Sequence, residues 1–439
     1  MFQLKLNKTM KNFQWSLISL ITASFIHLML RIMLGKEIGP SGLGIYTLIF
    51  TIYMLGMQFA GFGIGSALTK YIAEYRDNLS EIKEFISAGI LGSIVSGSVM
   101  GVFLYILSNI ISILFFHNPS MINLLKFTSL CFPFIAVQKA VIGSLNGLMD
   151  MKRYAIMNIT QSISVLIFTA FFVHSLDMNV RGAVLGFVIP TILVGLVSPI
   201  FIRNYLKVTP KFANKILKEF SLFGFYVVLT NSIGIISTEI DSLMIGYFMN
   251  ATDVGYYAVA IIFIQGLTLI PDAIQRVTTP LIATFYGKRD IESIRSLIKE
   301  TVTKVVFIIL FIDLIMIIFG KTLIRIIFTD EFIPAYPPLL ILLIGYSIYA
   351  AYVSIGTCLA SIGKVQIIFK ISVICAGLNT ILNVILISKF GLIGAACATS
   401  ASLVFTTLTN MYFVNKYTSK KYLGIPDSNI KSYHTPLVK

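Results

Sequence analysis

The sequence predicts an all-α polytopic membrane protein with about twelve transmembrane helices in two six-helix lobes. Three observations support this fold class: an apolar composition, long apolar runs that recur along the chain, and a short motif that occurs once in each half. Hydrophobic residues make up 56% of the 439 residues and charged residues only 12%, whereas a soluble domain carries roughly a quarter charged residues. An apolar run of about 20 residues is long enough to cross the hydrocarbon core as a helix.

A motif of two glycines and one tyrosine occurs twice, as IMLGKEIGPSGLGIY and as LMIGYFMNATDVGYY. The shared positions lie at an offset of 211 residues, close to half of the chain, and they are Gly35, Gly44 and Tyr46 in the first copy and Gly246, Gly255 and Tyr257 in the second. A long fixed period indicates a duplicated architecture. Because each copy joins two apolar runs, we expect a tight turn whose glycines adopt conformations that other residues resist.

The apolar runs divide the chain into twelve expected spans. In the first half they are 14–34, 45–67, 86–107, 122–147, 155–175 and 182–204, and in the second half 221–247, 255–283, 302–319, 337–361, 367–388 and 392–414. Six spans per half is an even number, so both halves enter the membrane from the same side and the repeat is parallel.

The expected organisation is an N-terminal lobe at 1–204, a charged linker at 205–220, a C-terminal lobe at 221–416 and a polar cytoplasmic tail at 417–439. The charged segments 70–84 and 288–300 follow the second span of each lobe. They are amphipathic, which predicts helices lying on the inner membrane surface.

Lysine and arginine residues concentrate on one predicted side of the membrane. With the N-terminus in the cytoplasm, 25 of the 34 fall in inner segments, and the outer loops hold only Lys36, Lys126, Arg181, Lys321, Arg325 and Lys389. This bias predicts a protein of the cytoplasmic membrane with both termini in the cytoplasm. The net charge of +15 thus follows membrane topology, and we expect no nucleic-acid partner. The four cysteines lack metal-site spacing, so we expect no metal site.

Seven ionisable residues lie within the spans, namely Arg31, Lys139, Glu239, Asp241, Asp272, Arg276 and Asp313. Each costs roughly 3 kcal/mol or more at the bilayer centre, so each is expected to face a wet cavity, pair with an opposite charge or reach the surface. The three cations are candidate substrate-binding residues for an anionic head group. Alternatively, Arg31 extends to the outer surface and Arg276 pairs with Asp272 one helical turn away. Lys139 has no acid at helical spacing.

Glu239, Asp241 and Asp313 are candidate ion-coupling or gate residues, although buried protonated acids are an equal alternative. Arg31 and Asp241 lie one residue apart at equivalent repeat positions. One hypothesis therefore pairs them across a closed outer gate, and the other gives Asp241 a partner within its own lobe.

Two further features concern the backbone of the spans. Pro271, beside Asp272 in mid-span, is the candidate hinge. Gly61, Gly63 and Gly65 predict close helix approach, and they do not indicate a nucleotide loop because no strand precedes them.

The chain resembles the multidrug/oligosaccharidyl-lipid/polysaccharide exporter superfamily. Within it the chain looks like the O-antigen-type polysaccharide flippases, which are related to stage V sporulation protein B and to the lipid II flippases. The resemblance covers all twelve spans. It rests on Arg31 to Gly35 with GPSGLGIY, on GFGIGSALTKYIAEYRD, and on Asp241 to Gly246 with DVGYYAVA.

This resemblance implies two lobes arranged as a V around a central cavity. It implies transfer of a polyprenyl-(pyro)phosphate-linked oligosaccharide from the inner to the outer leaflet by alternating access, for cell-surface polysaccharide biosynthesis. The implied partners are this substrate, membrane lipid and glycosyltransferases of the same pathway. No cofactor is implied, and coupling to H⁺ or Na⁺ stays open.

Two alternatives belong to other functional classes. A drug or cation antiporter of the same superfamily would need acids in each lobe, and the spans of the first lobe contain none. A membrane glycosyltransferase or polymerase acting on lipid-linked sugars would need a metal-binding or general-base carboxylate at the surface, and the loops are short and carry no DxD or HExxH motif. We therefore expect a transporter without catalytic residues, not an enzyme.

Overall fold

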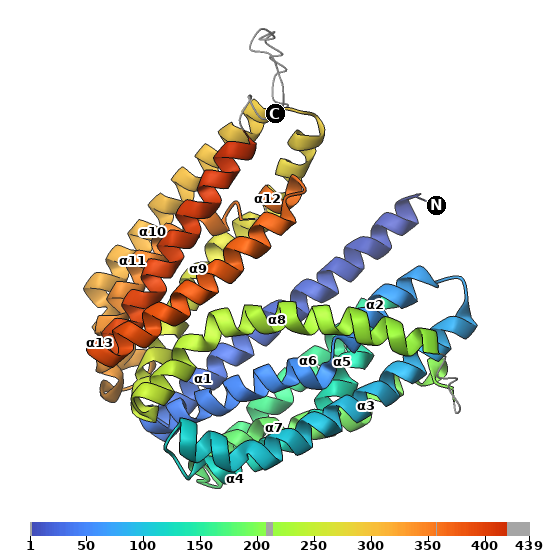
Figure 1. Ribbon diagram of the computed structural model, residues 1–439, viewed down its shortest axis with the longest axis horizontal. Helices are drawn as coiled ribbons and strands as arrows, with labels where there is room; N and C mark the ends of the chain where they lie inside the picture. The colour runs from blue at the N-terminus through green and yellow to red at the C-terminus, as the bar shows by residue number, and fades with distance from the viewer. Residues whose placement is uncertain (1, 208–213, 357, 419–439) are drawn as a thin grey trace. The chain divides into compact units, whose positions relative to one another are not determined.

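The computed structural model describes residues 2–207, 214–356 and 358–418. Within these ranges the regular structure is helical throughout and contains no strand (Figure 1). The predicted all-α fold class is therefore confirmed. Most of the expected tail at 417–439 and the centre of the expected linker at 205–220 lie outside the described residues.

The first half of the chain forms helices that pack mostly against helices distant in the sequence. In chain order they are α1 (Phe2–Gly61), α2 (Ile64–Glu74), α3 (Leu79–Asn109), η1 (Ile110–Phe115), α4 (Met121–Ser129), α5 (Phe132–Gly147), α6 (Met151–Ala170), η2 (Phe171–Ser175), α7 (Asn179–Val197) and η3 (Ser198–Tyr205). Helix α5 packs on α2 and α3, and α6 packs on α1 and α7.

The second half continues with longer helices. They are α8 (Asn214–Phe248), α9 (Ala251–Gly287), α10 (Ile291–Ile327), η4 (Asp330–Ala335), α11 (Tyr336–Val353), α12 (Cys358–Ser361) and α13 (Val365–Tyr417). Helix α11 packs on α13, whereas α8 packs on α1 and α2 of the first half.

The contacts divide the chain into two compact units. Unit 1 is Met1–Val259 with Thr322–Ala335, and unit 2 is Ala260–Lys321 with Tyr336–Lys439. Unit 1 therefore contains α8 and the start of α9 in addition to the first six expected spans. These units are defined by packing, and the lobe boundaries expected from the sequence repeat remain a prediction.

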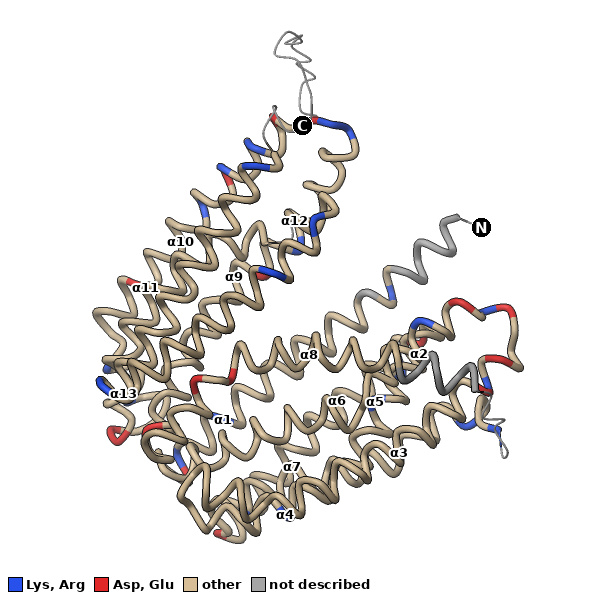
Figure 2. The backbone as a smooth tube through the Cα atoms, viewed as in Figure 1, with Lys and Arg blue, Asp and Glu red and all other residues tan. Residues whose placement is uncertain are grey.

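Helices of the described ranges are long and apolar enough for nine membrane crossings, or ten if the bent pair α4 and α5 counts as one. Two of them, α1 and α13, are each as long as two of the expected spans and bend at Gly39 and Gly391. Counted as two crossings each, they make the structure consistent with twelve spans. Figure 2 shows long uncharged stretches with charged residues gathered near the helix ends, as expected of a multi-pass membrane protein.

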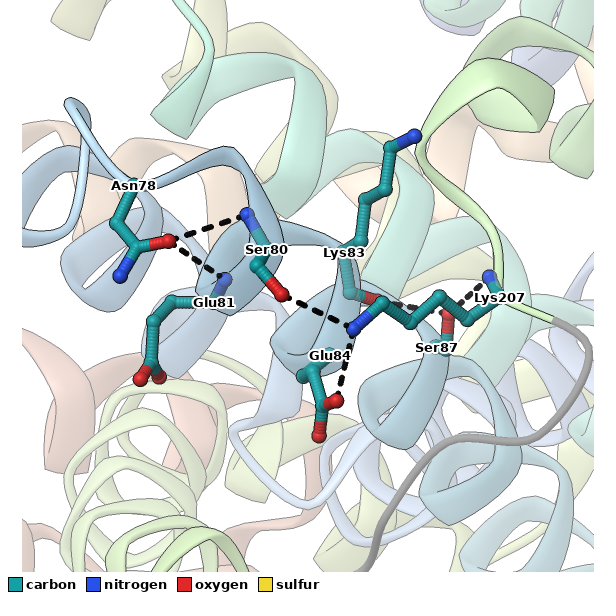
Figure 3. Close-up of polar contacts among 7 residues, drawn as sticks. All are labelled: Asn78, Ser80, Glu81, Lys83, Glu84, Ser87 and Lys207. Atoms are coloured by element: carbon teal, nitrogen blue, oxygen red, sulfur yellow. Dashed lines mark hydrogen bonds and ion pairs between the residues drawn. The ribbon is translucent and has the colours of Figure 1, made fainter.

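The expected surface helices at 70–84 and 288–300 are wrong. Residues 79–84 are the first turns of α3 and residues 291–300 are the first turns of α10, each continuous with a span. Both starts are capped by a side chain. Asn78 Oδ1 accepts from the N–H groups of Ser80 and Glu81 at 3.2 and 3.3 Å (Figure 3). Asp290 accepts from the N–H and hydroxyl of Ser293, which lowers the pKa of the Asp290 carboxyl.

The chain beyond η3 is attached to the start of α3. The Lys207 backbone N–H donates to Ser87 Oγ at 2.8 Å, and its ammonium group lies 2.8 Å from Glu84 Oε1 and 3.2 Å from Ser80 Oγ (Figure 3). Lys207 and Glu84 are both partly buried. This attachment holds the start of the segment between the two expected lobes against α3.

Candidate functional site

The two copies of the glycine–tyrosine motif pack against each other inside unit 1. A Cβ atom added to Gly44 would lie 1.7 Å from the Ala251 carbonyl oxygen, and one added to Gly255 would lie 2.0 Å from the Pro40 carbonyl oxygen. Gly44 corresponds to Gly255 and Pro40 to Ala251 at the offset of 211, so the contact is symmetric, as in an isologous interface. Residues 211 positions apart in the sequence therefore make equivalent contacts at this interface.

The expected conformational role of the motif glycines is wrong. Gly44 and Gly255 lie inside helices with negative φ, and they are glycines because two backbones meet there. The turn of the first copy is made by Gly39, at φ 63°. Its repeat equivalent, Asn250, separates α8 from α9, and its side chain bonds the backbone N–H of Asp253 at 3.0 Å.

The motif tyrosines occupy equivalent places but differ in their partners. The Tyr257 hydroxyl donates to Asp241 Oδ2 at 2.7 Å, and both residues are buried. Tyr46 is equally buried, yet its hydroxyl has no hydrogen-bond partner among the described residues. The reason is that Leu30 stands at the position equivalent to Asp241.

Replacing Tyr257 by phenylalanine is expected to lower the free energy of unfolding by about 1–3 kcal/mol, because a buried carboxyl group loses its donor. The matched control is Tyr46→Phe, which removes a hydroxyl with no recorded partner and should be nearly neutral. The measurement is the temperature at which half of the detergent-purified protein remains monodisperse. Equal losses for the two variants would contradict the assigned role of Asp241.

Arg31 and Glu239 come together in unit 1. The Glu239 carboxylate accepts from Thr51 Oγ1 at 3.2 Å, and the charge of Arg31 lies close enough to attract it. Glu239 is thus within electrostatic range of Arg31, although the two form no ion pair within 4 Å. Asp241 accepts instead from Tyr257. This arrangement favours the alternative in which Asp241 bonds within its own half of the sequence. The gate role of these residues stays a prediction.

Lys139, on α5, lines a pocket of about 230 Å³ in unit 1. The helix α1 ends at Gly61 and α2 begins at Ile64, and Gly63 between them has φ 66°. This break within the expected second span opens the pocket beside Lys139, while Val227, Val228 and Asn231 of α8 cover it.

The walls of this pocket combine polar and apolar side chains and contain no acid among the described residues. Asn231 Nδ2 donates to Gln58 Oε1 at 3.3 Å, and Thr69 donates to the Gly143 carbonyl at 2.9 Å. The Lys139 ammonium group forms no hydrogen bond or ion pair with the described residues. An uncompensated cation within the membrane region is costly, so this pocket is suited to an anion.

The glycines of the second expected span confirm the predicted close approach. A Cβ on Gly65 would lie 2.6 Å from the Lys139 carbonyl oxygen, and one on Gly143 would lie 2.0 Å from the Gly65 carbonyl oxygen. Helices α2 and α5 therefore meet backbone to backbone beside the pocket, and this contact places Lys139.

Asp272 lines a second pocket, of about 450 Å³, in unit 2. The charge of Arg276, one turn along α9, interacts with the Asp272 carboxylate, but the two form no ion pair within 4 Å. Arg276 itself is exposed. Helix α9 continues past Pro271 without an interruption of the helix. The hinge role of this proline stays a prediction.

Asp313 is buried between α10 and α11, where the Ser347 hydroxyl donates to its Oδ2. Its Oδ1 atom has no partner among the described residues. Asp313 is not among the residues that line the pocket of Lys139. Its predicted role in ion coupling stays a prediction.

Several polar residues of these pockets were not among the sequence-based candidates, chiefly Gln58, Asn231, Gln275, Tyr349 and Asn410. Uncharged polar residues are common within long spans, so hydropathy does not single them out. The repeat does not find them either, because none has an equivalent at the offset of 211 that lines the other pocket.

Comparison with known proteins agrees with this architecture. The model of the family described as polysaccharide biosynthesis protein matches residues 9–285, and a MatE model matches residues 227–385. An uncharacterized membrane protein of Methanocaldococcus jannaschii is 25% identical over 95% of this chain and 86% of its own length. A putative O-antigen transporter of Shigella flexneri is 25% identical over 91% of this chain and 96% of its own.

Among solved structures, the lipid II flippase MurJ in an inward-closed conformation superposes with a TM-score of 0.74 at 18% identity, covering 94% of this chain and 90% of that one. This likeness shows a shared fold. The match to the family model covers more than half of the sequence, and it confirms the superfamily resemblance seen in the motifs. The chain therefore belongs to the polysaccharide biosynthesis protein family of multi-pass membrane proteins.

Proposed function

We propose that this protein is a flippase that moves a polyprenyl-(pyro)phosphate-linked oligosaccharide from the inner to the outer leaflet of the cytoplasmic membrane by alternating access. The observation that carries the proposal is the environment of Lys139. Its ammonium group has no hydrogen-bond or ion-pair partner among the described residues and lines a pocket without an acid. The chain belongs to the polysaccharide biosynthesis protein family. A phosphate group suits this pocket, because a charge-assisted hydrogen bond is stronger than a neutral one.

The relatives support this assignment by their names. They include the putative O-antigen transporter of Shigella flexneri and a probable low-salt glycan biosynthesis flippase of Haloferax volcanii, which is 28% identical over 46% of this chain. A drug or cation antiporter would favour an acid over a lysine in the first pocket. The proposal places both termini in the cytoplasm, with glycosyltransferases of the same pathway as partners that supply the substrate.

Arg31 and Arg276 are proposed as further contacts to the anionic head group. Glu239, Asp241 and Asp313 are proposed for coupling to H⁺ or Na⁺ or for gating. The electrostatic attraction between Arg31 and Glu239 supports a gate in which an arriving phosphate competes with a carboxyl group for the Arg31 guanidinium.

The test is transfer in vesicles that contain the purified protein and lipid-linked oligosaccharides extracted from the producing organism. A membrane-impermeant oxidant reports which sugars face outward. In protein-free vesicles about half of the sugars should react, since a bilayer places them on both sides, and with the protein nearly all should react. The assay is run with and without H⁺ and Na⁺ gradients and a membrane potential. Reaction that stops at the protein-free level under every condition would refute the proposed activity.

A further inference from the structure

The pockets of the two units occupy equivalent places in the sequence repeat. Thr268, Asp272 and Val353 line the pocket of unit 2, and the residues 211 positions earlier, Met57, Gly61 and Ile142, line the pocket of unit 1. Equivalent spans of the two halves therefore contribute to both pockets. A duplicated pocket with changed side chains is expected to hold a different part of one ligand or a different ligand.

The chemistry of the two pockets has diverged. The unit 1 pocket combines a lysine with glycine backbone, and Gly61 stands where the other pocket has Asp272. The unit 2 pocket has no lysine or arginine among its lining residues, and it adds Asp272, Gln275, Tyr349 and Tyr352. An anion therefore fits the first pocket, but the second one calls for another ligand.

Several polar groups of the unit 2 pocket have no partner within the described chain. Asn410 is 2% exposed, and its Oδ1 atom accepts no hydrogen bond although its Nδ2 donates to the Thr406 carbonyl at 2.8 Å. The Asp272 carboxylate and the Gln275 amide likewise have no recorded hydrogen bond. Of these groups Asn410 is buried, whereas Gln275 is half-buried and Asp272 is exposed at the pocket wall. Buried polar groups are normally satisfied, so the unused Asn410 acceptor, beside the open Asp272 and Gln275 groups, points to a ligand that both donates and accepts.

Two tyrosines complete the pocket wall. The rings of Tyr349 and Tyr352 have centroids 6.0 Å apart, and the Tyr352 hydroxyl donates to the Gly356 carbonyl at 3.3 Å. An aromatic face accommodates the apolar C–H groups of a sugar ring, while each sugar hydroxyl both donates and accepts. We propose that the unit 2 pocket binds the carbohydrate part of the lipid-linked substrate, with Asp272, Gln275 and Asn410 bonding its hydroxyls and Tyr349 contacting its ring. This assignment rests on the proposed function.

Other ligands fit these observations less well. The pocket volume of about 450 Å³ lies in the range of small-molecule sites and far exceeds that of a bare cation. Asp272 is the single acid among the lining residues, and the nearby Arg276 charge opposes a cation. An apolar drug would leave the amide and carboxyl groups unpaired.

The test measures binding of two radiolabelled probes to the detergent-purified protein: the lipid-linked oligosaccharides extracted from the producing organism, and the same extract after mild acid has removed the glycan. Tyr349→Leu and Gln275→Leu should each weaken binding of the intact probe by about tenfold, the size of a lost hydrogen bond or ring contact. They should leave binding of the glycan-free probe unchanged. Tyr412→Leu is the matched control, because Tyr412 is 62% exposed and is not a lining residue.

Each other outcome overturns the assignment. Unchanged binding of the intact probe, or equal weakening of both probes, would show that the pocket does not hold the glycan. Stabilisation of the wild type by Na⁺ that disappears in Asp272→Asn would assign a cation site instead. If the wild type binds neither probe, the proposed function itself fails, whereas normal binding by all variants removes only the sugar site.

Discussion

Replacing Gly44 by alanine is expected to destabilise the protein by about 3 kcal/mol or more, at the upper end of what overpacking costs. The added Cβ atom would lie 1.7 Å from the carbonyl oxygen of Ala251 and 2.9 Å from the backbone nitrogen of Gly255. These are backbone atoms, so no side-chain rotation relieves the clash, and the two motif copies must separate. The measurement is the yield and thermal stability of monodisperse protein in detergent.

The symmetry of this contact supplies a second variant, and an open glycine supplies the control. Gly255→Ala should have a similar effect, because its Cβ would lie 2.0 Å from the Pro40 carbonyl oxygen. Gly234→Ala, on α8, should not destabilise the protein, since nothing lies within 4 Å of its added Cβ and alanine favours a helix over glycine. A Gly44→Ala protein as stable as the wild type would refute the packing explanation of the repeated motif.

Replacing Lys139 by alanine is expected to reduce transfer of the lipid-linked sugar by about 10- to 100-fold, which corresponds to the loss of about 1.5–3 kcal/mol for a hydrogen bond to a charged group. Lys139→Arg keeps the cation and should retain more activity. Thermal stability should not fall in Lys139→Ala, because the substitution removes an ammonium group with no recorded counter-ion. Transfer is measured in reconstituted vesicles with the impermeant oxidant.

The matched control for this series is Lys152→Ala. Lys152 is exposed near the start of α6, on the same predicted side of the membrane, and lines neither of the two pockets. Its loss lowers the net charge equally but should leave transfer unchanged. Equal rates for Lys139→Ala and the wild type would remove Lys139 from the substrate path, and equal losses for Lys139→Ala and Lys152→Ala would indicate a general effect of charge.

Taken together, the glycine contact and the two pockets show one duplicated framework with diverged chemistry. Glycine stands at both equivalent contact positions, Gly44 and Gly255. The lining residues have changed, from Gly61 in one pocket to Asp272 in the other. Under the proposed function, this difference in lining lets one chain present a site for the phosphate and a site for the sugar hydroxyls.

The sequence by itself determined the fold class, most span positions and the repeat offset of 211. These depend on hydropathy and periodicity, which are properties of the chain read in order. It also identified Lys139 as a cation that local pairing does not explain. The number of residues required to cross a membrane is fixed by its thickness, so the long apolar runs left few alternative positions for the spans.

Only the tertiary structure decided which side chains meet. Gly44 is required by a backbone 207 residues away in the chain, at Ala251, and no local pattern distinguishes that need from a turn. Asp241 accepts a hydrogen bond from Tyr257, and the acid that attracts Arg31 electrostatically is Glu239. In a membrane helix every backbone group is already satisfied within the segment, so the sequence of one helix does not specify its neighbour. The close approach of two helix surfaces determines which helices are neighbours. It therefore also determines which side chains line each pocket.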